Sequence, residues 1–146
     1  MIRNFEQQDI DNVVRIWLDA SLIAHSFIPE DYWKGKSEEL RELYLPNSKT
    51  FVYENENAEL LAFISMKDHY IAALFVDPME QGKGIGKQML YFVKQLHQSL
   101  ELDVYTENLN SVAFYKKQGF IVQEEGIEER TGHKEYKMRY HSEEIQ

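Results

Sequence analysis

The chain contains no cysteine, and this absence excludes disulfide bonds, cysteine-ligated zinc and thiol nucleophiles. No stretch approaches the roughly 20 apolar residues that a membrane-spanning helix requires. The first six residues also lack the apolar run of a signal peptide. These absences predict a protein that folds without disulfides, does not act at a membrane and resides in the cytoplasm.

Positive charge is also scarce. The chain has 16 Lys and Arg residues against 25 Asp and Glu residues, which gives a formal net charge of −9. A surface of this sign repels DNA and RNA, and no basic stripe overrides it, so no nucleic-acid partner is expected. The charge would attract a cationic substrate, although it also serves solubility alone. Histidines and carboxylates show no spacing typical of a metal site, so no metal is expected.

Length and hydrophobic periodicity predict one globular domain over residues 1–146. The predicted order is strand, two helices, three strands, helix, strand, helix and two strands, which is typical of an α/β domain. The elements are a strand over 2–5, a helix from Ile10 capped by Asp9, a helix over 29–45, strands over 50–53, 60–66 and 70–76, a helix over 84–100, a strand over 102–105, a helix over 108–118, and strands over 121–122 and 136–140.

Three of these segments carry more detailed expectations. In the second helix, Leu40, Leu43 and Tyr44 are expected to face inward. The apolar segment 70–76 is expected to be a central strand buried on both faces. In the helix over 84–100, six apolar residues recur at helical spacing and should share one face: Ile85, Met89, Phe92, Val93, Leu96 and Leu100.

A glycine-rich turn follows the apolar strand 70–76 and opens the next helix. Gly82, Gly84 and Gly86 alternate along it, and glycine lets the backbone approach a ligand closely. The unpaired amides at a helix start carry partial positive charge, which Lys83 and Lys87 increase here. The segment therefore predicts an anion site suited to phosphates, with an ordinary strand-to-helix turn as the alternative.

Two common phosphate-binding patterns do not fit this turn. A Walker loop needs Gly in place of Gln81 and Ser or Thr in place of Gln88. A dinucleotide fingerprint starting at Gly82 needs Gly in place of Lys87. Both patterns are therefore excluded on the residues present.

A third pattern does fit, namely Gln or Arg, two residues, Gly, one residue, then Gly or Ala. Gln81, Gly84 and Gly86 match it, behind the segment 74–78. The turn resembles the acetyl-CoA pyrophosphate loop of the GNAT N-acetyltransferase superfamily.

A second motif of that superfamily occurs later in the chain, where Asn108, Ser111, Tyr115, Gly119 and Phe120 fall at matching positions. The resemblance covers almost the whole chain. In detail the sequence is similar to a small bacterial branch that includes protein lysine acetyltransferases. The resemblance implies one GNAT-type α/β (α+β) domain, with a mixed, mostly antiparallel sheet of six to seven strands and about four flanking helices.

The resemblance also implies site residues. Acetyl-CoA would be the cosubstrate, and Tyr115 would lie near its sulfur to protonate or hydrogen-bond the departing thiolate. Tyr115 as a core residue and Asn108 as a plain N-cap are the alternatives. The residues expected to bind the cosubstrate are Leu74, Phe75, Val76, Gln81, Gly82, Lys83, Gly84, Ile85, Gly86, Lys87, Asn108, Ser111 and Tyr115.

The general base is less clearly marked. Many relatives place a Glu on the central strand, whereas this chain has none over 69–73. Asp68, His69 and His25 are the candidates, each acting through water. Four aromatic residues could line the acceptor pocket: Phe27, Tyr32, Trp33 and Tyr70. For Tyr32 and Trp33, packing between helices is the alternative.

These features predict an enzyme that moves an acetyl group to a primary amine by direct attack in a ternary complex. The expected acceptor is a protein lysine or a protein N-terminus. A small amine is a second possibility, and a non-catalytic acyl-CoA-binding domain is a third of a different class. The chain is expected to be a monomer or a homodimer.

Overall fold

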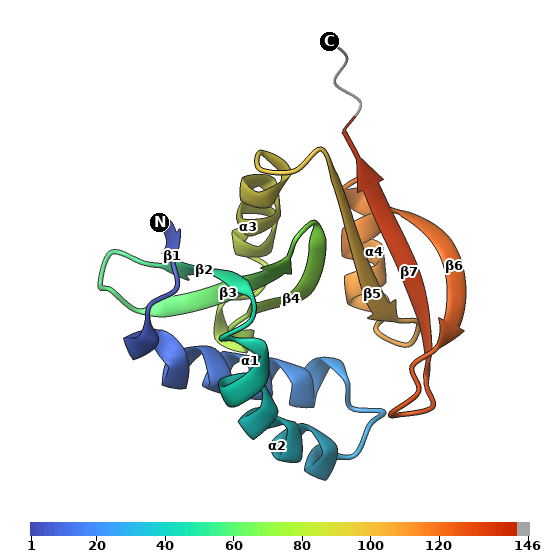
Figure 1. Cartoon of the computed structure of the whole chain (residues 1–146), viewed down its shortest axis with the longest axis horizontal. Coiled ribbons are helices and arrows are strands. Elements are labelled where there is room, and N and C mark those ends of the chain that lie inside the picture. Colours follow the sequence, from blue (N-terminus) through green and yellow to red (C-terminus); the bar gives the residue numbers. More distant parts are fainter. Residues whose placement is uncertain (143–146) are drawn as a thin grey trace.

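A computed structural model describes residues 1–142, which form one seven-stranded sheet with helices on both faces (Figure 1). The strands are β1 (Ile2–Asn4), β2 (Lys49–Glu54), β3 (Leu60–Lys67), β4 (Tyr70–Val76), β5 (Ser99–Tyr105), β6 (Ile121–Ile127) and β7 (Lys134–His141). The helices are α1 (Ile10–Ala24), α2 (Glu30–Glu39), α3 (Ile85–Lys94) and α4 (Leu109–Lys117), with a π-turn over Leu40–Tyr44 and short 3₁₀ turns over Gln7–Asp9 and Pro78–Glu80. Within these residues, no helix has both the length and the apolar character of a membrane span.

The strand order is β1-β2-β3-β4-β5-β7-β6. All neighbouring strands are antiparallel except β4 and β5, which are parallel and paired only where Tyr70 lies opposite Glu101. Beyond that pair the two strands diverge, as Figure 1 shows, so each presents an unpaired edge to the other. The sheet thus consists of two halves joined at one end, and the predicted mixed, mostly antiparallel α/β fold is confirmed.

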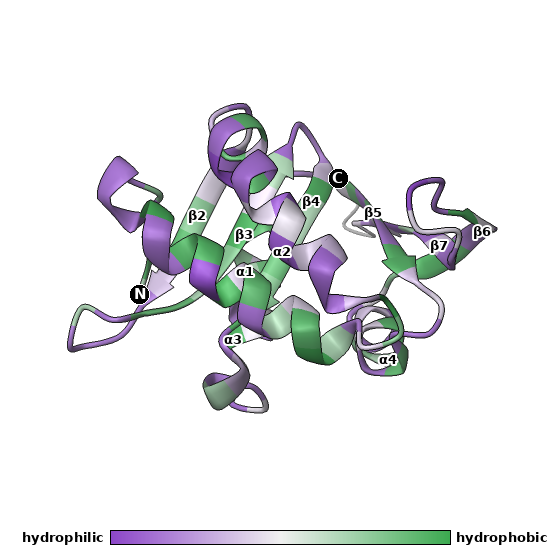
Figure 2. Cartoon of the chain, turned by 90° about the horizontal axis from the view of Figure 1, so that it is seen from below, coloured by the Kyte–Doolittle hydropathy of each residue, from purple (hydrophilic) through white to green (hydrophobic). Residues whose placement is uncertain are grey.

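The core has two compartments because side chains alternate along each strand. Ala62 and Ile64 on β3 pack with α3 and α4, whereas Phe63 between them packs with α1 and α2. Figure 2 shows apolar and polar bands alternating along α1, whose buried residues include Val13, Ile16 and Trp17. The two helix layers therefore fix the position of β4 from both sides.

The structure corrects the expectation that Leu43 faces inward, because its side chain is 51% exposed. The second helix ends in the π-turn, where the amide of Leu45 donates to the carbonyl of Leu40 at 2.9 Å. A π-turn holds an extra residue, which shifts the helical period. Leu40 and Leu45 are therefore buried, and Leu43 faces outward.

The expectations for segments 70–76 and 84–100 are also corrected. Of β4, only Ile71 is buried, because the strand lacks a neighbour along most of one edge. The helix α3 ends at Lys94, which leaves Leu96 53% exposed. Leu100 belongs to β5, where pairing opposite Tyr140 on β7 overrides the helical period.

Candidate active site

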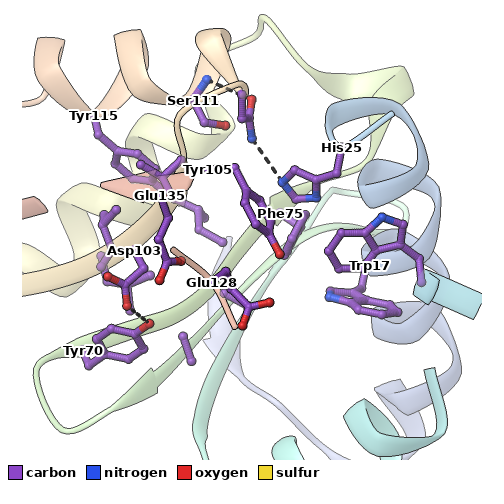
Figure 3. Close-up of a pocket in the computed structure, with 18 residues that line it drawn as sticks. Trp17, His25, Tyr70, Phe75, Asp103, Tyr105, Ser111, Tyr115, Glu128 and Glu135 are labelled. Atoms are coloured by element: carbon purple, nitrogen blue, oxygen red, sulfur yellow. Dashed lines mark hydrogen bonds between the residues drawn. The ribbon is translucent and has the colours of Figure 1, made fainter. Parts of the chain in front are cut away.

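The divergence of β4 and β5 opens a cavity of about 400 Å³ between the two halves of the sheet (Figure 3). Strands β4 and β5 form two of its sides. Trp17 comes from α1, His25 is the C-cap of that helix, and Trp33 comes from α2. The residues from the remaining elements are Asn108, Ser111 and Tyr115 at α4, Glu128 in the turn after β6, and Glu135 on β7.

Strand alternation explains why polar groups of β5 reach this cavity. Leu102 and Val104 are buried in the core under α3 and α4, so Asp103 and Tyr105 point to the opposite face. The antiparallel register places Glu135 of β7 opposite Tyr105. Side chains far apart in the sequence therefore meet on one side of the sheet.

Tyr115 offers a protonated hydroxyl to the cavity. Its side chain is 8% exposed, and its ring centroid lies 5.2 Å from that of Phe114 and 5.4 Å from that of Phe120. Burial raises the pKa of Tyr115 well above its usual value, so the phenol keeps its proton at neutral pH. The hydroxyl makes no hydrogen bond to any other residue within 1–142, so it remains available as a donor.

His25 is held neutral beside the same cavity. Its ring stacks on Trp33 with centroids 5.0 Å apart, and burial lowers the pKa of His25 to about 4. The Nδ2 amide of Asn108 lies 3.3 Å from His25 Nε2, and Asn108 Oδ1 accepts from the amide of Ser111 at 3.3 Å. Because an amide nitrogen only donates, His25 Nε2 accepts and Nδ1 carries the proton.

Carboxylates form the opposite wall. The hydroxyl of Tyr70 donates to Asp103 Oδ2 at 2.8 Å, and both residues line the cavity. Burial raises the pKa of Glu135, and the negative charges of Asp103 and Glu128 raise it further. A group with this environment accepts a proton more readily than a free glutamate does.

The glycine-rich turn lies at the end of β4 and presents open backbone. Gly82 and Gly84 both have φ of +85°, and a side chain at either position would meet nothing within 4 Å. Gly84 is the N-cap of α3, so the first amides of that helix point out of the turn. Gln81 Nε2 braces the turn by donating to the carbonyl of Val76 at 3.1 Å. Free amides at a helix start fit a diphosphate group.

A sequence model of the family described as "Acetyltransferase (GNAT) domain" matches residues 13–142. The chain belongs to the GNAT acetyltransferase family. It is 36% identical over 123 residues to "Peptidyl-lysine N-acetyltransferase YiaC" of Escherichia coli strain K12, covering 84% of each protein. It is 31% identical over 121 residues to "Peptidyl-lysine N-acetyltransferase YjaB" of Salmonella typhimurium, covering 83% of each.

Solved structures share the fold of this chain. The apo form of YjaB from Escherichia coli superposes with a TM-score of 0.87 at 24% identity, over 97% of both chains. The PaiA N-acetyltransferase of Thermoplasma acidophilum, solved in complex with coenzyme A, has a TM-score of 0.80 at 18% identity, over 97% of this chain and 98% of that one. The GNAT chain described here is thus an N-acetyltransferase, and acetyl-CoA is the donor that its family implies.

The predicted cosubstrate residues fall into two groups. Leu74, Phe75, Asn108, Ser111 and Tyr115 line the cavity. The others surround the end of β4 and the start of α3: Val76, Gln81, Gly82, Lys83, Gly84, Ile85, Gly86 and Lys87. Among these, the side chain of Ile85 belongs to the core, and Lys83 pairs with Glu80 at 3.1 Å.

Only some of the residues predicted as the base or as the acceptor pocket line the cavity. His25, Trp33 and Tyr70 line the cavity. His69 does not line this cavity, because it sits in the β3–β4 turn beside the exposed Asp68, with its Nε2 3.6 Å from Glu101 Oε2. Neither do Phe27, which packs on Tyr105 and His133, and Tyr32, which packs on Trp33.

Sequence reasoning did not single out the carboxylates of the cavity. Asp103 lies between the buried Leu102 and Val104, so the alternation of β5 already indicated a separate polar face. Glu135 carried no such local signal, because its place depends on the register between β5 and β7.

Proposed function

We propose that this enzyme transfers the acetyl group of acetyl-CoA to the side-chain amine of a lysine in a protein. One observation carries the proposal: a protonated tyrosine and a wall of carboxylates line a single cavity where β4 and β5 part. The carboxylates suit a cationic amine, and the tyrosine suits a leaving thiolate. The relatives named as peptidyl-lysine acetyltransferases favour lysine in a protein as the acceptor.

The residues present fit acetyl-CoA, which supplies the acetyl group and a thiolate leaving group. The amides around Gly82 and Gly84 would hold its diphosphate, because both glycines leave the backbone uncovered. The free edge of β4 at Leu74 and Phe75 would hold the amide groups of its pantetheine arm, as one strand holds another.

Glu135 is the general base in this proposal. A lysine amine has a usual pKa of about 10.4, so it must lose a proton before it can attack. Glu135 takes that proton directly or through one water, while Asp103 and Glu128 attract the incoming ammonium. His25 suits this role less, since its pKa is about 4 and its Nε2 already accepts from Asn108.

Replacing the base tests this assignment. We expect Glu135→Gln to lower kcat/KM for a lysine peptide by about 10²-fold, because a neutral amide cannot accept the proton. In the same variant, the acid limb of the pH–rate profile should disappear, because the carboxylate that titrates there is gone. Glu124→Gln, at an exposed position of β6, removes the same charge outside the cavity and should keep both the rate and the profile.

The function itself is tested by release of free CoA from acetyl-CoA. A lysine peptide blocked at its N-terminus, a peptide with a free N-terminus and no lysine, and a polyamine are the three acceptors. We expect release with the first. Binding of CoA without release on any acceptor would instead show a non-catalytic acyl-CoA-binding domain.

A further inference from the structure

A second cavity, of about 550 Å³, adjoins the first. The two share Trp17, Tyr70, Ala72 and Ala73, so they lie side by side at the start of β4. The second cavity lies between α2 with its π-turn, the strand β3 and the turn that joins β6 to β7. Nothing in the proposed acetyl transfer uses it.

This cavity is lined by cations in a protein whose net charge is −9. Lys36, Lys67 and Arg130 all line it, and no Asp or Glu within residues 1–142 does. Lys36 is 15% exposed and pairs with the neighbouring Glu39 at 3.2 Å. Glu39 therefore offsets one of the three positive charges.

The other two cations form no ion pair within residues 1–142, although the negative charge of Glu39 also acts on Arg130. Arg130 Nη1 donates to the hydroxyl of Tyr44 at 3.0 Å, and its side chain pairs with no carboxylate of residues 1–142. Lys67 likewise has no ion pair within that range. A guanidinium held at one nitrogen keeps its other donors free, and its planar fork matches a carboxylate.

Charge is thus sorted between the two cavities. Carboxylates line the first, and cations line the second. One turn supplies both signs, since Glu128 reaches the first cavity and Arg130 the second, and the amide of Arg130 donates to Glu128 Oε2 at 3.1 Å. This bond holds the Glu128 side chain against the backbone of Arg130, while the Arg130 side chain points to Tyr44.

We infer that the second cavity binds the carboxylate of an Asp or Glu close in sequence to the acceptor lysine. The lysine amine enters the first cavity while the acidic side chain pairs with Arg130 and Lys67. Leu40 and Leu43 give the methylene groups of that side chain an apolar wall. The inference rests on the proposed function, since it names the class of peptide that the enzyme prefers.

The experiment compares pairs of peptides that each contain one lysine and differ only by Glu or Gln at a single position. Four positions are tested: two before, one before, one after and two after the lysine. The readout is the ratio of kcat/KM for the Glu peptide over the Gln peptide. We expect the ratio to reach about five-fold at one or more positions and to fall as salt is added, because Arg130 and Lys67 are exposed and exposed ion pairs are weak and screened.

Two variants of the enzyme and one control variant complete the experiment. Arg130→Gln and Lys67→Gln should each bring the ratio toward one. Lys34→Gln lies on the same helix as Lys36 but outside both cavities, and it should keep the wild-type ratio.

The outcomes separate the two proposals. Acetylation of all peptides with a ratio near one, or a ratio unaffected in both variants, overturns the carboxylate site and leaves lysine acetylation standing. Better use of free lysine than of any peptide overturns the assignment to a peptide and indicates a small amino acid. No acetylation of any peptide overturns the proposed function, and the inference falls with it.

Discussion

For Tyr115, burial limits what the phenol can do in the reaction. Its pKa is raised above the usual value of about 10, whereas a thiol titrates near 8.5. Complete transfer of the phenolic proton to the departing thiolate is therefore unfavourable. In the proposed reaction, the hydroxyl would therefore serve as a hydrogen-bond donor whose strength grows as negative charge develops on the sulfur.

Removing that donor gives the first residue-scale prediction. We expect Tyr115→Phe to lower kcat by about 10²-fold while the KM for acetyl-CoA changes little, because the bond strengthens only as the thiolate leaves. Steady-state kinetics with a fixed peptide measures both constants. Tyr91→Phe removes a hydroxyl from a side chain that is 64% exposed on α3, and it should leave both unchanged. Equal losses in the two variants would remove Tyr115 from the reaction.

His25 predicts how stability depends on pH. Its pKa is about 4 in the folded chain against 6.5 when exposed, so the unfolded chain binds the proton first as pH falls. The stability that neutral His25 provides is complete above pH 6.5 and is lost as pH falls toward 4. The loss amounts to at most about 3 kcal/mol.

Urea unfolding measured across that range tests the assignment. In His25→Gln the free energy of unfolding should fall less steeply with decreasing pH. His141→Gln, at an exposed position, controls for the loss of a histidine. An unchanged slope in His25→Gln would show that another group governs this pH range.

The sequence predicted which single residues reach the cavity only where one short segment of the chain contains the whole motif. Tyr115 and Asn108 belong to one short motif, and the structure brings both to the cavity. Glu135 and Asp103 meet only because β5 pairs with β7 in one particular register. Pairing of that kind depends on tertiary contacts, which no pattern within a single segment encodes.

Among the elements, the start of α3 depends on its glycine. Gly84 has φ of +85°, a left-handed conformation that costs other residues about 1–2 kcal/mol even where space is free. We expect Gly84→Ala to lower the free energy of unfolding by roughly that amount and to weaken CoA binding several-fold, since the first amides of α3 would be displaced.

A second glycine provides the control. Gly35 lies in the middle of α2 and has nothing within 4 Å of a built side chain. Gly35→Ala should therefore stabilise the chain by about 0.5–1 kcal/mol and leave CoA affinity unchanged. Chemical denaturation and calorimetric titration with CoA distinguish the two variants. Unaltered CoA binding in Gly84→Ala would place the diphosphate elsewhere.

The order of helices and strands followed from the hydrophobic periodicity of the sequence, but the ends of two helices did not. The pattern over 84–100 continues through Leu96, yet the chain must leave α3 so that Leu100 can pair in β5. The end of the second helix contains no Gly, and its π-turn depends on burying Leu40 and Leu45 together. Both outcomes come from the packing of the whole sheet, which outweighs local preference.

The molecule as a whole is a sheet in two halves. On one side β1 to β4 are continuously paired, and on the other β5, β7 and β6 are. Across the junction, β4 and β5 pair only at Tyr70 and Glu101. The amide of Glu101 also donates to the carbonyl of His69 at 3.1 Å, and the hydroxyl of Tyr70 donates to Asp103. The amides of β4 that point toward β5 beyond Tyr70 therefore lack a strand partner, and they are the donors that a pantetheine arm would use.

Hydrogen exchange should reveal this arrangement. Without CoA, the amides of 72–76 that point toward β5 should exchange much faster than those of β3, which is paired on both sides. Saturating CoA should slow them, because a ligand that binds only the folded chain, and pairs with this edge, protects the amides it covers. Amides of β7, which is already paired with β5 and β6, provide the internal reference. If CoA protected the start of α3 but left the edge of β4 unchanged, the diphosphate would sit at the glycine turn without the arm entering between the halves, and Tyr115 could then not reach the sulfur.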